Sequence, residues 1–381
     1  MRKFRLLFTG DTVISTQRQI NFDENLKKVL DTHDVICCNY EAPVITKYST
    51  PSEDPDCKLG QSMVGLSTLV EAGFNLFALA NNHIMGYGAD ALENTIGAIR
   101  NLGARTIGAG MTWDDVYRPY IVSVDGLRVG IINIGERQFG TADQYGGCGY
   151  AWLGNYRVND QIRNLQKRCN RVIAVVHAGL ENVDVPLPEW REYYKHLIDD
   201  GVDAVIAHHP HVMQGWEDYH DGRIYYSLGN FLWECPSVAS CMNPAFVVSM
   251  TITPTGINYE EIPVIYKEGN ISICQDNVVV QYMKSLCDVL QNKNEYIKFV
   301  NKGCAEVYRK WYKIYPYCVV HQYEWNGWKN IIKNIYSFIR YGWKVDERRL
   351  YLLSVSETFR YTVSRGIPLE NNWQERKNEK L

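Results

Sequence analysis

The sequence has neither a large charge excess nor a long apolar stretch. Its 40 Lys and Arg nearly balance its 43 Asp and Glu, for a net charge of -3, and no motif resembles a defined nucleic-acid reader. No stretch approaches the roughly eighteen apolar residues of a membrane span, and Gly10-Asp11 follows the start too soon to leave room for a signal peptide. We therefore expect a cytoplasmic protein with no membrane span and no nucleic-acid partner.

The sequence also lacks the spacing of a disulfide or zinc framework. Its 11 cysteines are an odd number without any Cys-x-x-Cys pair, and Cys37-Cys38 lie within an apolar strand pattern, which favours buried thiols in a reducing compartment. No linker rich in Ser, Gly or Pro divides the chain, and no internal repeat is evident. The hydrophobic content of 46% over 381 residues is enough for a large folded core.

Three histidines follow a probable buried strand. The string Ala207-His208-His209-Pro210-His211 comes directly after the apolar run from Val202 to Ile206. Neutral imidazole offers a nitrogen lone pair at physiological pH, which makes it a good ligand for a transition metal. A solvated surface turn is the alternative interpretation of this string alone.

Four other apolar runs end in polar residues that complement these histidines. Taken singly, those residues also fit turns, helix caps or loop charges. Because ligands gather outside the carboxyl ends of the strands in open α/β architectures, we expect the five clusters to meet at one metal site. The four runs end at Gly10-Asp11, Asn39-Tyr40-Glu41, Asn81-Asn82-His83 and His177-Ala178-Gly179-Leu180-Glu181.

Together with Tyr226-Ser227-Leu228-Gly229-Asn230-Phe231, these motifs resemble the CapA family of bacterial capsule and poly-gamma-glutamate synthesis proteins. The resemblance covers residues 1 to about 268. That family is similar to the calcineurin-like metallophosphoesterases, which implies an α/β fold. Two mixed β-sheets are then expected to pack face to face, with helices outside and a dinuclear metal site at the strand ends.

The resemblance also implies a role for each motif residue. Glu41 stands where the parent superfamily has the aspartate that bridges two metals, and His83 matches the catalytic histidine that faces the substrate. His208 and His209 should point to opposite faces of an extended segment, so only one of them is expected at the metal. His208, Glu181, Asn230 and Asn39 are expected to orient ligands or contact the substrate. The implied metal ligands are Asp11, Glu41, Asn82, His177, His209 and His211.

The expected ligands also indicate which metals fit the site, and two positions depart from the family pattern. Mixed nitrogen and oxygen ligands suit one or two divalent ions of manganese, iron or zinc. Val13 occupies the position of a histidine ligand in the parent superfamily, which predicts weaker binding of one metal. Gly86 occupies the position of an aspartate that the family usually carries, which predicts a less firmly oriented His83.

Three function classes fit these motifs, and a metal-dependent, phosphoesterase-like hydrolase linked to surface polysaccharide or poly-gamma-glutamate synthesis is favoured. Its substrate is expected to be an anionic small molecule or polymer. The second class is a metal-dependent enzyme acting on amide or gamma-glutamyl linkages of an anionic polymer. The third is a non-catalytic metal-binding scaffold in capsule assembly.

Residues 269–381 are expected to form a separate helical unit. Apolar and aromatic residues recur at helical spacing from about Asn277, then over Trp325–Tyr341 and Asp346–Arg365, with a polar tail after Pro368. This part carries more Lys and Arg than Asp and Glu, so a basic surface for an anionic polymer, a membrane surface or an acidic partner is one interpretation. The favoured alternative is that its tryptophans pack inward. These are Trp311, Trp325, Trp328 and Trp343.

Overall fold

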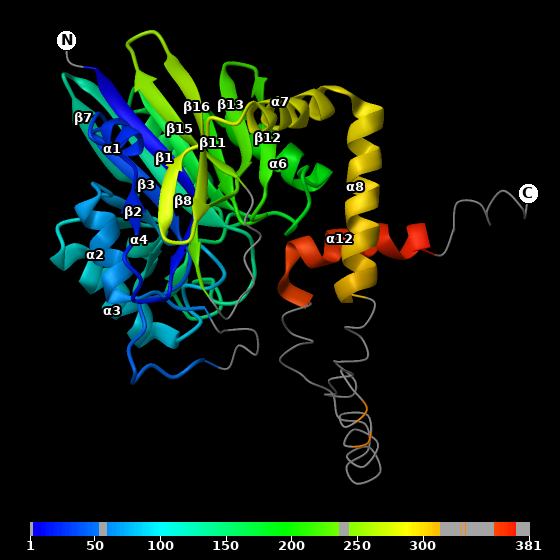
Figure 1. The fold of residues 1–381 in the computed structure, drawn as a ribbon, viewed down its shortest axis with the longest axis horizontal. Coiled ribbons are helices and arrows are strands. Elements are labelled where there is room, and N and C mark those ends of the chain that lie inside the picture. The colour runs from blue at the N-terminus through cyan, green and yellow to red at the C-terminus, as the bar shows by residue number, and fades with distance from the viewer. Residues whose placement is uncertain are drawn as a thin grey trace, which may run out of the picture.

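The computed structural model describes residues 3–52, 59–235, 244–312, 328, 332 and 354–370. Within these residues, two large mixed β-sheets form the body of the protein, and helices surround them (Figure 1). A two-stranded sheet of β6 (Ala109–Gly110) and β9 (Gly149–Tyr150) lies apart from both.

The first sheet contains the N-terminal strand at its centre. From edge to edge its strands are β2 (Asn21–Phe22), β17 (Asn270–Ile273), β16 (Ile257–Lys267), β15 (Ala245–Ile252), β1 (Phe4–Ile14), β3 (Val35–Tyr40), β4 (Leu76–Ala78) and β5 (Arg105–Ile107). The neighbouring strands β1, β3, β4 and β5 run parallel to one another, whereas β15 is antiparallel to β1. The strand β14 (Asn230–Glu234) also pairs with β1, in parallel.

The second sheet has a parallel centre and antiparallel edges. Its strands, in order, are β12 (Met213–Tyr219), β13 (Gly222–Leu228), β11 (Ala204–His208), β10 (Arg171–His177), β8 (Leu127–Gly135) and β7 (Tyr120–Val124). The edge strands β7 and β12 are antiparallel to their neighbours. The ends of β8, β10 and β11 therefore lie along one edge of this sheet.

The two sheets pack face to face, as the alternation of side chains along their strands requires. On β1, Leu6 and Phe8 enter a core shared with Val175 of β10 and Ile206 of β11. Leu7, which points to the opposite face, packs in a separate core beneath the helices of the first sheet. Burial on both faces explains why these strands are continuous apolar runs. The predicted two-sheet sandwich is confirmed.

Helices cover the outer face of each sheet. The outer core of the first sheet includes α1 (Glu24–Leu30), α2 (Met63–Glu71) and α3 (Gly88–Asn101). The outer core of the second includes α5 (Arg157–Gln166) and α6 (Pro188–Asp199), with the short α4 (Trp113–Val116) beside them.

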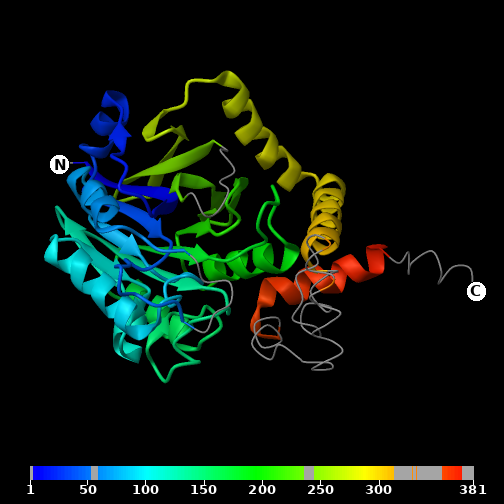
Figure 2. The same ribbon diagram turned by 60° about the horizontal axis from the view of Figure 1, so that its bottom comes forward.

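A helical C-terminal segment is also confirmed. The helix α7 (Asn277–Gln291) packs on β12, and α8 (Lys293–Val307) continues through a short π-helix, η1 (Tyr308–Tyr312). The helix α12 (Glu357–Glu370) packs against α8, and both views place the three long helices at one side of the sandwich (Figures 1 and 2). The strand β17 still belongs to the first sheet, so the helices begin at Asn277. The boundary at residues 268 and 269 stays a prediction.

Several expectations for the C-terminal part fall outside the described residues. These are most of Trp325–Tyr341, the stretch from 346 to 353, and the tail after 370. Among the four tryptophans, only Trp328 has a described side chain, and it is 68% exposed. The inward packing that we favoured for these tryptophans is therefore not confirmed.

Two other sequence expectations concern membranes and cysteines. In the described part of the chain, no helix combines the length and the apolar character needed to cross a bilayer. Among the cysteines described there, Cys37, Cys38, Cys235, Cys274 and Cys304 are buried. This agrees with their predicted role as small buried apolar residues.

Candidate metal site

The polar residues expected at the strand ends do meet where the ends of the two sheets face each other. Asp11 on β1 lies beside Asn39 on β3, while His177 at the end of β10 pairs with His208 at the end of β11. We call the six predicted ligands the strand-end cluster. Its members are Asp11, Glu41, Asn82, His177, His209 and His211.

A glycine allows β1 to approach the turn before β14. A Cβ atom on Gly10 would lie 1.9 Å from the carbonyl oxygen of Gly229, so no side chain fits at this position. The next residue, Asp11, donates its backbone N–H to the same oxygen at 3.0 Å and lies opposite Asn230 in the sheet. The close approach therefore brings the Asp11 carboxylate to the strand-end cluster.

Glu41 stands at the centre of the cluster. Its carboxyl oxygen Oε1 is buried and has no hydrogen-bond partner in the described part of the chain. Three imidazole Nε2 atoms surround it, at 3.6 Å for His211, 3.8 Å for His83 and 3.9 Å for His177. These separations are too long for hydrogen bonds, and they are slightly longer than the roughly 3 to 3.5 Å between two ligands that lie about 2.1 Å from a shared ion. Small side-chain movements would bring the nitrogens and the orphaned oxygen to ligand distance, so this oxygen fits a bound cation.

Two sets of ligand atoms share Glu41. The first consists of Glu41, His177 and His209, and the second consists of Asp11, Glu41 and His211; within each set the atoms lie within 4.8 Å of one another. Asn82 completes the first set, because its Oδ1 lies 3.1 Å from Nε2 of His177. This arrangement suits the bridging role expected for Glu41, although the ligand roles themselves stay predictions.

The loop after β11 holds its histidines in an unusual backbone conformation. His209 and His211 have φ values of 98° and 59°, in the left-handed region that non-glycine residues rarely occupy. Asp11 Oδ2 accepts the N–H of His209 at 3.3 Å. Nδ1 of His211 lies 3.1 Å from Asn230 Oδ1, which leaves its Nε2 toward Glu41. This contact suits the orienting role expected for Asn230, which stays a prediction.

The remaining motif residues surround the ligands. Asn39 donates from Nδ2 to Asp11 Oδ1 at 2.7 Å and lies 3.1 Å from Nδ1 of His177. His208 is buried, and its Nδ1 approaches Asp11 Oδ1 at 3.6 Å, apart from the set that contains His209. Glu181 is exposed, yet it offers an oxygen within 4.8 Å of ligand atoms of His209 and His211.

Burial keeps several of the imidazoles neutral. It lowers the pKa of His83 and of His208 to about 4, and that of His209 to about 3, so their lone pairs are available at pH 7. Burial also opposes the charged form of His211, but the carboxylates of Glu41 and Asp11 outweigh it and raise its pKa to about 10. A cation at this site must therefore displace a proton.

The two departures from the family pattern have visible consequences. Val13 is fully buried in an apolar cluster with Leu59 and Trp233, so it supplies no ligand. Nδ1 of His83 is buried and has no hydrogen-bond partner among the described residues. The weaker orientation of His83 that follows from Gly86 in place of an aspartate stays a prediction.

The sequence reasoning missed Glu136, which directly follows β8. It is buried, and its Oε1 lies 3.5 Å from Nε2 of His209. Gln138 donates to that oxygen at 3.1 Å and also accepts from Asn82 at 3.0 Å. Burial raises the pKa of Glu136 to about 8, although the groups that donate to it favour its ionised form. The signal was the apolar run Leu127–Ile134 ending in Gly135-Glu136, the same pattern as the five clusters.

Comparison with a family profile shows which family this chain belongs to. The profile of the family described as "Bacterial capsule synthesis protein PGA_cap" matches residues 5–234. The chain belongs to this family. It is 29% identical over 212 residues to "Capsule biosynthesis protein CapA" of Bacillus anthracis, covering 54% of this chain and 52% of that protein. It is 25% identical over 213 residues to "PGA biosynthesis protein CapA" of Bacillus subtilis (strain 168), covering 55% and 56%. The chain thus spans about half the length of each relative.

Among solved structures, the 5'-nucleotidase of Candida albicans is similar at a TM-score of 0.42 and 10% identity, covering 80% of this chain and 58% of that one.

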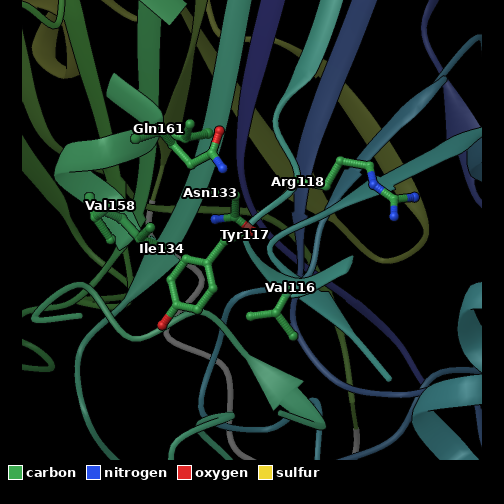
Figure 3. Close-up of a pocket in the computed structure, with 8 residues that line it drawn as sticks. Val116, Tyr117, Arg118, Asn133, Ile134, Val158 and Gln161 are labelled. Carbon is green, nitrogen blue, oxygen red and sulfur yellow. The ribbon is translucent and has the colours of Figure 1, made fainter. Parts of the chain in front are cut away.

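Apart from the strand-end cluster, a small cavity lies between α4, α5 and β8 (Figure 3). Tyr117, Ile134 and Gln161 are among the residues around it. Its volume of about 10 Å³ holds one water molecule, so the strand-end cluster remains the candidate site.

Proposed function

We propose that this member of the capsule synthesis family is a metal-dependent hydrolase of a phosphoester in an anionic substrate of surface polysaccharide or poly-gamma-glutamate synthesis. The observation that carries the proposal is the buried Glu41 oxygen without a hydrogen bond among three imidazole nitrogens. An unpaired buried carboxylate is costly, and perturbed ionisable groups of this kind gather at functional sites.

Two metal positions are proposed, with Glu41 between them. One set of ligands is Glu41, Asn82, His177 and His209, and the other is Asp11, Glu41 and His211. When bound, a manganese, iron or zinc ion supplies Lewis-acid chemistry, because it polarises the ester and lowers the pKa of a water molecule. With fewer protein ligands, the second position is proposed to bind its ion more weakly.

His83 is proposed to act on the leaving group. Its Nε2 faces the cluster, 3.8 Å from Glu41, and its side chain is 22% exposed, so it can reach both the site and a bound substrate. Because burial lowers its pKa to about 4, the ring is neutral at pH 7 and carries one N–H. It would therefore stabilise the charge that develops on the leaving oxygen by donating a hydrogen bond.

A non-catalytic metal-binding scaffold in capsule assembly is the second candidate. It is favoured by the same histidine, because a ring whose buried Nδ1 has no partner lacks the group that would fix its orientation for catalysis. The apolar surroundings of Val13 also favour a site with one firmly bound ion.

The experiment uses the full chain, stripped with a chelator and reloaded with Mn²⁺ or Zn²⁺. Metal content is measured by elemental analysis, and turnover is measured with bis-p-nitrophenyl phosphate and with a gamma-glutamyl p-nitroanilide. Turnover of the diester only after reloading supports the hydrolase. Turnover of the anilide alone moves the reaction to gamma-glutamyl linkages, and bound metal with neither turnover favours the scaffold. A chain that binds no metal refutes the proposal. Cell fractionation tests the cytoplasmic location, which is part of the same proposal.

A further inference from the structure

The beginning of the C-terminal helix α12 contacts the missed carboxylate Glu136. Thr358 is buried in the first turn of this helix. Its backbone N–H and its hydroxyl both donate to Glu136 Oε2, at 3.1 Å and 2.6 Å. Trp190 of α6 donates from Nε1 to the same hydroxyl at 2.9 Å. Because the hydroxyl accepts from Trp190, its own hydrogen is free to point to Glu136.

The other oxygen of Glu136 faces the strand-end cluster. Oε1 lies 3.5 Å from Nε2 of His209 and accepts from Gln138 at 3.1 Å. The Nε2 atom of His209 is also contacted by Nε2 of Gln138 at 3.3 Å, the same amide that donates to Glu136. Nδ1 of His209 is buried and has no hydrogen-bond partner among the described residues, so Nδ1 is the nitrogen left for an ion. A carboxylate that holds the second nitrogen of a ligand imidazole fixes its tautomer and its orientation.

Further contacts hold α12 in this place. Glu357 accepts the backbone N–H of Arg137 at 2.9 Å, which ties the helix to the loop that carries Glu136. Farther along the helix, Arg365 donates to Glu189 of α6 at 2.6 Å. The start of α12 is thus anchored to both the loop and the neighbouring helix, so Thr358 has a fixed position relative to Glu136.

We propose that Thr358 is a positioning residue of the metal site, which acts through Glu136 to hold the ring of His209 with Nδ1 toward the bound ion. The inference rests on the proposed metal binding and adds to it. It makes α12, which lies outside residues 5–234 matched by the family profile, a working part of the site. The C-terminal segment would then influence metal affinity from outside the residues that the family profile matches.

The test is a titration of the metal-free full chain with Co²⁺, whose visible spectrum reports the ligand geometry. Thr358→Val removes the hydroxyl and preserves the shape of the side chain, and Thr358→Ser restores a hydroxyl. Thr362→Val is the matched control, because Thr362 is buried in the same helix and its hydroxyl donates to the backbone oxygen of Thr358. We expect Thr358→Val to weaken Co²⁺ binding by about tenfold or more and to change the spectrum. The other two variants should stay close to the wild type.

Wild-type Co²⁺ affinity and spectrum in folded Thr358→Val would overturn the inference. If that variant does not fold, the same Co²⁺ titration is made on Glu136→Gln, because this change replaces the carboxylate and leaves the side chains of α12 unaltered. Weaker Co²⁺ binding by Glu136→Gln supports the inference, and unchanged binding overturns it. A wild-type chain that binds no Co²⁺ would instead refute the proposed metal site, and the positioning role with it, so the two failures are distinguishable.

Discussion

Replacing His209 with alanine removes an imidazole whose ring centroid lies 4.7 Å from that of His177. In the wild type, Mn²⁺ at about 100 times its Kd should stabilise the folded chain by about 2.7 kcal/mol. At about 2 to 4 °C per kcal/mol, this corresponds to a rise in Tm of about 5 to 10 °C. Removing one of the four ligands should weaken Mn²⁺ binding by at least about 100-fold. That factor is the upper end of the range for removing a group that only supports a ligand. At the same Mn²⁺ concentration, the stabilisation then falls to about 0.4 kcal/mol, or about 1 °C.

The assay is thermal unfolding of the metal-free protein with and without Mn²⁺, together with elemental analysis of the reloaded protein. His196→Ala is the control, since that histidine lies on α6, its side chain is 63% exposed, and it pairs with Asp200 at 3.6 Å. It should retain the full Mn²⁺-dependent rise in Tm. If His209→Ala also retains the rise and the bound metal, the assignment of His209 as a ligand is wrong.

Three further predictions concern catalysis, protons and backbone packing. His83→Ala should leave metal content unchanged and lower turnover by roughly 10² to 10⁴; equal loss of metal in both histidine variants would mean that His83 is a ligand. Because neighbouring carboxylates raise the pKa of His211 to about 10 in the metal-free protein, Mn²⁺ binding at pH 7 should release about one proton and tighten as the pH rises toward 10. Calorimetry in two buffers of different ionisation enthalpy measures this release, and a value near zero would contradict it. Gly10→Ala should lower the free energy of unfolding, measured in urea, by about 1 to 3 kcal/mol or more, because the added Cβ atom would collide with the carbonyl oxygen of Gly229. Gly97→Ala, with open space around its Cβ inside α3, should instead be neutral or stabilising by up to about 1 kcal/mol; an equal loss in both variants would refute the steric argument.

The convergence of the cluster was predictable from strand periodicity, whereas the arrangement of two packed sheets was implied by the family resemblance. Apolar runs that are buried on both faces have to be inner strands, and the polar residue after each run has to lie at a strand end. This is why Asp11 and His177, which are 166 positions apart in the sequence, contact the same Asn39 side chain. Glu136 obeys the same rule and was missed only because a single carboxylate after a glycine resembles an ordinary turn.

Other features depend on tertiary contacts that no local pattern encodes. Thr358 donates to Glu136 across 222 positions of sequence, and a threonine near the start of a helix is common for local reasons alone. The choice of imidazole nitrogen is equally hidden, because it depends on which ring nitrogen the neighbouring carboxylate or amide occupies. His209 and His211 show this, since Gln138 and Glu136 lie beside Nε2 of one ring and Asn230 lies beside Nδ1 of the other.

Several local rules of folding are broken at one place in this chain. The left-handed backbone of His209 and His211 and the buried carboxyl group of Glu41, whose Oε1 has no hydrogen-bond partner among the described residues, each destabilise the metal-free fold. Natural sequences concentrate such conflicts at functional sites. The proposed divalent cation would oppose all of them together, because it would neutralise the carboxylates and bond to the imidazoles that the strained loop presents. One bound ion would therefore account for both the strain and the orphaned oxygen, which separate structural causes would leave as unrelated defects.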